Sequence, residues 1–127
     1  MKAGDTFRWA DRALEKHLWI VISDPLLDVA DDVAIVRLTT RRKDSDCTCI
    51  LQPGDHPFIT HETVVDYGCA LDISNAGLEG FVGNGKAFLR ERVSAEVLDR
   101  IRQGAAESGD MPEGCKEILI RQGLINP

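Results

Sequence analysis

Two short apolar runs dominate the first third of the chain. Residues 17–23 read HLWIVIS and residues 33–40 read VAIVRLTT. Each run is short, rich in β-branched or aromatic residues and bounded by Asp, Pro or Ser, which favours a strand over a helix. Neither run alternates cleanly between apolar and polar residues, so we expect both strands to be buried on both faces. Polar side chains stand at the ends of these runs, and a functional site is expected to gather there.

The rest of the chain adds shorter strands first and helices last. Strands are predicted at residues 6–9, 48–51, 64–67, 70–73 and 86–93, and the glycine-rich residues 77–85 are predicted to form a loop. Ser94 is a good N-cap for a helix that starts at Ala95. Pro112 suits the first turn of a second helix, and residues 110–127 form a C-terminal helical extension. The predicted class is α+β.

Composition narrows the class of protein. The chain has 127 residues, which predicts one domain over residues 1–127. Its net charge of −6 argues against a wholly basic nucleic-acid clamp but allows a local basic patch. No apolar run is long enough to span a membrane, and the first residues lack the apolar core of a signal peptide. We therefore expect a cytoplasmic protein with no membrane contact, in which the four cysteines are reduced thiols.

The order of several weak motifs resembles the PemK/MazF-like toxin family. Gly4 and Asp5 precede an aromatic strand, a second strand ends in Ser-Asp-Pro (23–25), and a third ends in Leu-Thr-Thr (38–40). Short strands and the Ser-capped helix at 93–103 follow, so the resemblance covers residues 4–107. The family's Arg-Pro pattern at the second strand is replaced here by His17-Leu18. The strand resembling Asp-Gln-Ile-Arg in many members is replaced by CALDIS (69–74).

This resemblance implies a small SH3-like β-barrel that forms a homodimer. It also implies a metal-independent endoribonuclease that acts on single-stranded RNA and is restrained by an antitoxin protein. Thr39 matches the place of the family's catalytic threonine, and His17 stands at the place of its catalytic arginine. No cofactor is expected.

Cleavage of RNA without a metal needs a base for the 2′-hydroxyl, an acid for the leaving oxygen and donors for the phosphate. Histidine suits both proton roles. We predict that His17 and His56 form the acid/base pair and that Thr39 and Arg41 lie near the phosphate. The residues predicted to bind substrate are Lys16, Arg37, Arg41, Arg42 and His61.

Each of these residues also has an ordinary structural interpretation. His17 can be a solvated strand end, His56 can fix its Asp-His-Pro turn, and Thr39 can simply favour a strand. Arg41 and Arg42 can belong to a solvated loop, in which nearby acids offset their attraction for phosphate. The alternative function is therefore a non-catalytic barrel of the same fold that binds a protein or nucleic acid.

Cysteine and histidine also raise the possibility of zinc. Cys47 and Cys49, followed by His56 and His61, are the right ligand types. Their CxC spacing departs from the CxxC knuckle of common zinc sites, so we predict no metal and expect Cys49 to pack in the core.

Overall fold

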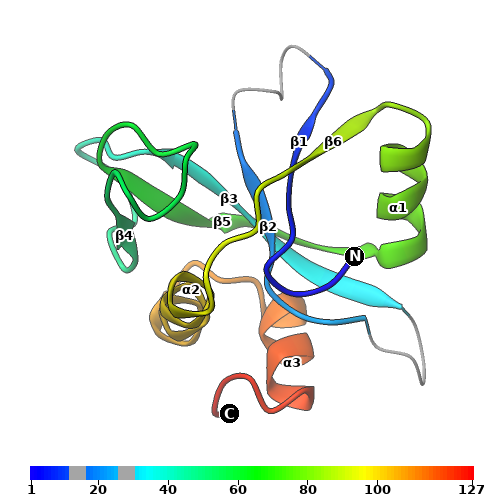
Figure 1. Cartoon of the computed structure of the whole chain (residues 1–127). Helices are drawn as coiled ribbons and strands as arrows, with labels where there is room; N and C mark the ends of the chain where they lie inside the picture. Colours follow the sequence, from blue (N-terminus) through cyan, green and yellow to red (C-terminus); the bar gives the residue numbers. More distant parts are fainter. Residues whose placement is uncertain (12–16, 26–30) are drawn as a thin grey trace.

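The computed structural model describes residues 1–11, 17–25 and 31–127 and confirms the α+β class (Figure 1). The elements, in chain order, are strands β1 (Thr6–Trp9), β2 (Trp19–Val21), β3 (Asp32–Thr40), β4 (Ile50–Leu51) and β5 (Thr63–Ser74), helix α1 (Asn75–Gly83), strand β6 (Ala87–Arg90), and helices α2 (Ala95–Glu107) and α3 (Glu113–Arg121).

The six strands form one antiparallel sheet in the order β4-β5-β3-β2-β1-β6. The two apolar runs thus become inner strands, as predicted, and β3 pairs with β2 on one side and the long β5 on the other. The register of β3 and β5 shifts between Ile35 and Arg37, which marks a bulge beside Val36. Among the described strands, β4 and β6 are the two edges and do not pair with each other, so the SH3-like barrel is not confirmed.

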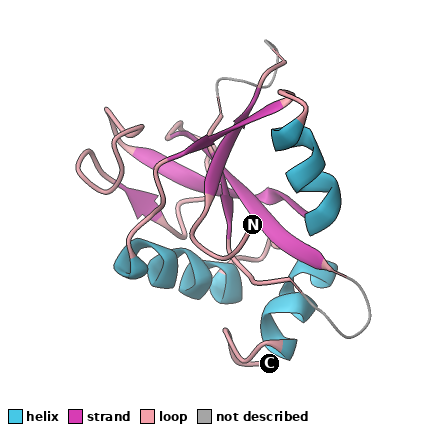
Figure 2. Cartoon of the chain, turned by 45° about the vertical axis from the view of Figure 1, so that its right-hand side comes forward, coloured by secondary structure: helices cyan, strands magenta, loops and turns pink. Residues whose placement is uncertain are grey.

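Helices cover both faces of this sheet (Figure 2). Ala34, Val36 and Leu38 of β3 pack in the larger core cluster beneath α2 and α3. Val33 and Ile35 point the other way, into a smaller cluster with Leu78 of α1. Successive strand residues face opposite sides of a sheet. Because both sides are covered here, the run at 33–40 is apolar without alternation.

The prediction of a loop over the glycine-rich segment is wrong. Residues Asn75–Gly83 form α1, and Ser74 caps it by accepting from the Gly77 N–H at 3.2 Å. Leu78 is fully buried, and Phe81 and Val82 pack against the smaller cluster. Tertiary packing therefore overrides the low helix propensity of glycine. The two short strands predicted around Gly68 are also one continuous strand, β5.

Both C-terminal helices are confirmed. Ser94 accepts from the Val97 N–H at 3.1 Å, which caps α2 as predicted. Pro112 is the residue before the first turn of α3. Cys115 and Leu119 of α3 join the larger core cluster together with Ile101 of α2. None of the helices in the described part of the chain is long and apolar enough to cross a membrane.

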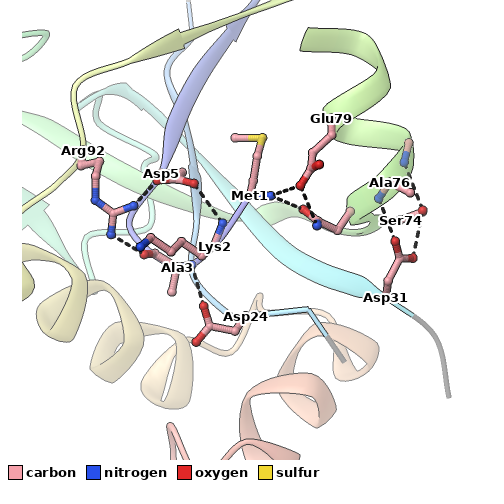
Figure 3. A network of polar contacts seen from close by, with 12 residues as sticks. Met1, Lys2, Ala3, Asp5, Asp24, Asp31, Ser74, Ala76, Glu79 and Arg92 are labelled. Carbon is pink, nitrogen blue, oxygen red and sulfur yellow. Dashed lines mark hydrogen bonds and ion pairs between the residues drawn. The ribbon is translucent and has the colours of Figure 1, made fainter. Parts of the chain in front are cut away.

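A polar network ties the first residues to α1 and to the segment before α2 (Figure 3). The amino group of Met1 donates to Asn75 Oδ1 at 2.8 Å and to Glu79. Arg92 pairs with Asp5 and donates to the Ala3 carbonyl. These contacts link the residues before β1 to α1 and to the segment after β6.

Asp31 anchors the start of α1 in the same region (Figure 3). Its carboxylate accepts from the Ala76 N–H at 2.7 Å and from Ser74 Oγ at 3.0 Å. These bonds, the Ala76 bond foremost, lower the pKa of Asp31. A lowered carboxyl pKa stabilises the fold above the unfolded value of about 4, and this contribution is lost as the pH falls through the folded value.

We therefore expect Asp31→Asn to lower the melting temperature at neutral pH, with a gap to the wild type that closes in acid. Thermal melts of both proteins at about pH 7 and about pH 2.5 measure the gap. A gap of equal size at both values would mean that the carboxylate charge is not the stabilising feature.

Candidate functional site

The end of β3 opens into a cavity of about 570 Å³, which we call the rim cavity. Three parts of the chain form its wall: the end of β3 and the residues after it, His17 in the segment before β2, and the segment that leads into β5. Five predicted site residues line it, namely His17, Arg37, Thr39, Arg42 and His61. Its other lining residues are Leu38, Thr40, Phe58, Thr60 and Thr63.

His17 is oriented by the backbone of β3. Its Nδ1 lies 3.0 Å from the Leu38 carbonyl oxygen. A carbonyl only accepts, so Nδ1 carries the proton and donates it. In the neutral ring Nε2 is then the nitrogen that can take up a proton. This hydrogen bond fixes both the tautomer and the direction of a half-buried imidazole at the cavity wall.

His61 is held between two threonine hydroxyls. Its Nε2 lies 2.9 Å from Thr40 Oγ1, and its Nδ1 lies 3.2 Å from Thr60 Oγ1. A hydroxyl both donates and accepts, so this cradle accommodates the neutral and the protonated ring. His61 is exposed. It is therefore a second titratable group at the same cavity as His17.

Arg37 supplies positive charge but shares it with a carboxylate. Its Nε and Nη2 donate to Asp66 Oδ2 at 3.0 and 2.9 Å, across the β3–β5 pair. About a quarter of each side chain is exposed. Burial raises the pKa of the neighbouring Cys69 thiol, and hydrogen bonding with Asp66 adds to the rise. The ion pair fixes the orientation of the Arg37 guanidinium plane. The Asp66 carboxylate also offsets part of the positive charge that Arg37 presents to the cavity.

Thr39 and Arg42 complete the polar wall. Thr39 pairs with Val64 of β5 and is half-buried, which confirms that it lies at a strand end. Arg42 follows β3, and its backbone N–H donates to Ser45 Oγ at 2.8 Å. Its side chain is exposed at the cavity. Together these residues place a hydroxyl and a cation beside the two histidines.

Phe58 gives the cavity an aromatic wall that we did not predict. Its ring packs against the larger core cluster, and the guanidinium carbon of Arg8 lies 5.3 Å from the ring centroid. The sequence signal for Phe58 was weak, because it consists of one aromatic residue two positions after His56 in a turn. Asp66 and Thr63 were also missed, because only the register of β3 and β5 brings them to the end of β3. Thr60, in the segment before β5, was missed as well.

His56 lies away from the rim cavity, and we correct its place in the predicted acid/base pair. The ring is 5% exposed. Its Nε2 lies 2.5 Å from the Glu91 carbonyl and so donates, and its Nδ1 accepts from the Phe58 N–H at 3.0 Å. With both nitrogens bound to backbone, His56 has the structural role that its turn also suggested.

One more predicted residue, Arg41, does not line the cavity. Arg41 pairs with Glu62, whose other oxygen accepts from Gln52 at 2.9 Å. The hydrogen bond from Gln52, followed by that from Arg41, lowers the pKa of Glu62. Arg41 thus takes part in an exposed ion pair with Glu62. Lys16 lies outside the described residues.

His56→Ala should destabilise the protein by roughly 1–3 kcal/mol, because it leaves the Glu91 carbonyl and the Phe58 N–H without their partner. Urea unfolding followed by circular dichroism measures the change. The rim cavity keeps its lining, so activity per folded molecule should stay close to that of the wild type. A variant of full stability would show that these two bonds contribute little.

The two cysteines of the CxC pair lie in different environments. Cys49 packs in the larger core cluster as expected, where burial raises its thiol pKa, while Cys47 is exposed. Within residues 1–11, 17–25 and 31–127, no group of three or more His, Cys, Asp or Glu side chains is placed to hold a metal ion. All four cysteines are free thiols.

Comparisons with protein-family models and with curated protein sequences gave no match.

Proposed function

We propose that this protein binds single-stranded RNA in the rim cavity and cleaves its phosphodiester backbone without a metal. The observation that carries this proposal is the meeting of His17, His61 and two arginines at one cavity. These residues come from segments far apart in the chain. They combine two proton-transfer groups with cations suited to a phosphate. The resemblance to PemK/MazF-like toxins supports the same reaction class.

The reaction assigns one role to each histidine. His17 Nε2 takes the proton of the ribose 2′-hydroxyl, and the 2′-oxygen forms a bond to the adjacent phosphorus. The bond from phosphorus to the 5′-oxygen breaks, and His61 gives that oxygen a proton. The products are a 2′,3′-cyclic phosphate and a 5′-hydroxyl end, so the protons balance.

The remaining wall residues act on the phosphate and on the base. Arg37 and Arg42 donate to the non-bridging oxygens, where negative charge grows in the transition state. Thr39 adds a hydroxyl donor. Phe58 offers an apolar contact for an unpaired base, which favours single-stranded over duplex RNA.

The test is incubation of the purified protein with single-stranded RNA in excess EDTA, followed by analysis of the product ends. We expect fragments with a cyclic phosphate and a 5′-hydroxyl, and no cleavage of the same sequence in a duplex. RNA that binds but stays intact would contradict catalysis. Failure to bind any single-stranded RNA would contradict the whole proposal.

A second candidate function is RNA binding without cleavage. The Arg37–Asp66 ion pair favours it, because Asp66 brings negative charge to the phosphate site. The replacement of the family's Arg-Pro by His17-Leu18 points the same way. The EDTA experiment separates the two candidates. The homodimer and the antitoxin partner stay predictions of the resemblance.

A further inference from the structure

Aromatic and guanidinium side chains continue from the rim cavity onto the β1–β6 edge of the sheet. Phe58 lines the cavity, and Arg8 of β1 lies over its ring. Arg8 is paired in register with Phe88 of β6. Residues directly opposite each other in antiparallel strands share a face, with Cβ atoms about 5 Å apart. Phe88 therefore stands beside Arg8 on the same side of the sheet.

Arg90 extends this row by one more step. Strand alternation puts Phe88 and Arg90 on one face, and the Arg90 guanidinium carbon lies 6.0 Å from the Phe88 ring centroid. We call Phe58, Arg8, Phe88 and Arg90 the aromatic track. It alternates ring and cation, and it begins at a residue that also belongs to the rim cavity.

The track includes an exposed ring, whereas two residues on the opposite face of the same strands are buried. Phe88 is 46% exposed although it is a large apolar ring. On the opposite face, Phe7 and Ala87 are buried in the smaller core cluster under α1. What sets Phe88 apart is that two guanidinium groups lie beside its exposed ring, an arrangement on which a nucleic-acid base can stack.

The chemistry of the row matches one kind of ligand. Single-stranded nucleic acids bind on aromatic side chains that stack with bases, next to cations that contact the backbone. The track adds two guanidinium groups to the two in the rim cavity, on a chain whose net charge is −6. Positive charge gathered along this path therefore complements a polyanion.

We propose that the aromatic track binds the nucleotides that flank the scissile phosphate, so that the substrate is an extended RNA strand several nucleotides long. This inference rests on the proposed function and adds the path of the strand beyond the cavity. Phe88 is the residue that distinguishes the track from the cavity alone, because it lies outside the cavity wall and Phe58 does not.

The test compares Phe88→Ala with Leu89→Ala as the matched control. Leu89 is the next residue, is 53% exposed and faces the other side of the strand. Binding is measured by fluorescence anisotropy with labelled, randomised RNAs of about three and about twelve nucleotides, carrying 2′-O-methyl groups to prevent cleavage. Circular dichroism verifies that both variants are folded.

We expect Phe88→Ala to weaken binding of the longer RNA roughly tenfold, as for the loss of one stacked base, and to leave the shorter RNA unaffected. Leu89→Ala should leave both unchanged. If both variants bind the longer RNA like the wild type, the proposal that the aromatic track binds RNA is overturned. The proposal that the rim cavity binds RNA is unaffected by that result. The same holds if Phe88→Ala instead changes the molecular mass in solution, since the ring then serves an interface between copies. If the wild type binds neither RNA, the proposed function itself fails.

Discussion

Replacing His17 by Asn is expected to slow the cleavage of single-stranded RNA about 100-fold or more, with little change in RNA affinity. General acid–base groups contribute roughly 10²–10⁴-fold to rates. Asn keeps an N–H that can donate to the Leu38 carbonyl, as His17 Nδ1 does now. The substitution therefore removes the titratable Nε2 while it preserves the anchor. Single-turnover cleavage and equilibrium binding measure the two effects separately.

The pH dependence of the cleavage rate provides a second test with the same variant. If two histidines transfer protons, the rate of the wild type should rise and then fall with pH, and His17→Asn should lose one limb of that curve. His56→Asn is the matched control, because it removes a histidine of the same chain that lies outside the rim cavity. Equal losses in both variants, measured per folded molecule, would remove His17 from the mechanism.

Gly104→Ala should lower stability by roughly 3 kcal/mol, the largest effect expected from one methyl group in this protein. A Cβ at this position of α2 would overlap the Tyr67 hydroxyl oxygen. It would also lie 2.9 Å from Tyr67 Cζ and 3.0 Å from Cys49 Cβ. Tyr67 is fully buried and donates to the Ile101 carbonyl at 2.7 Å. The methyl group must therefore displace α2 or break a buried hydrogen bond.

The Tyr67 hydroxyl is shielded from water. This burial is the largest cause of the rise in the pKa of Tyr67 well above its usual value. A buried hydroxyl that loses its acceptor regains no water, so the full desolvation cost remains. For a chain of this size the loss corresponds to a fall of about 10 °C in melting temperature.

Gly114→Ala is the control for this experiment. Gly114 lies in α3, and an added Cβ there meets no atom within 4 Å. Alanine favours a helix over glycine by about 1 kcal/mol, so stability should stay unchanged or rise slightly. Thermal melts of the two variants side by side measure the difference. If both variants melted at the same temperature, α2 would not pack on Tyr67 as closely as described.

Local sequence pattern was sufficient for the inner strands and for the C-terminal helices. The runs at 17–23 and 33–40 lack alternation because core clusters lie on both sides of the sheet, and this can be inferred from the residues alone. Ser94 marks the start of α2 for an equally local reason, since its side chain satisfies the Val97 N–H. Helix α1 was missed because Gly77, Gly80 and Gly83 suggested a loop, whereas long-range packing of Leu78 decides the outcome.

The candidate site was predictable in part for a similar reason. His17 and Thr39 stand at the ends of adjacent strands, so a correct prediction of the strands brings them to one rim. The choice between His56 and His61 depends on how the turn after Gln52 folds. That turn directs His56 inward to the Glu91 carbonyl, 35 residues away in the chain. No local pattern contains that contact.

The most direct test of the rim cavity as the RNA site is an NMR titration that follows the three imidazole rings separately. An uncleavable single-stranded RNA is added to the protein with labelled histidines. We predict that the ring signals of His17 and His61 shift together and saturate with the same affinity, while those of His56, bound on both sides by backbone, stay in place. A shift confined to His56, or no shift in any ring when anisotropy shows that the RNA is bound, would contradict the account.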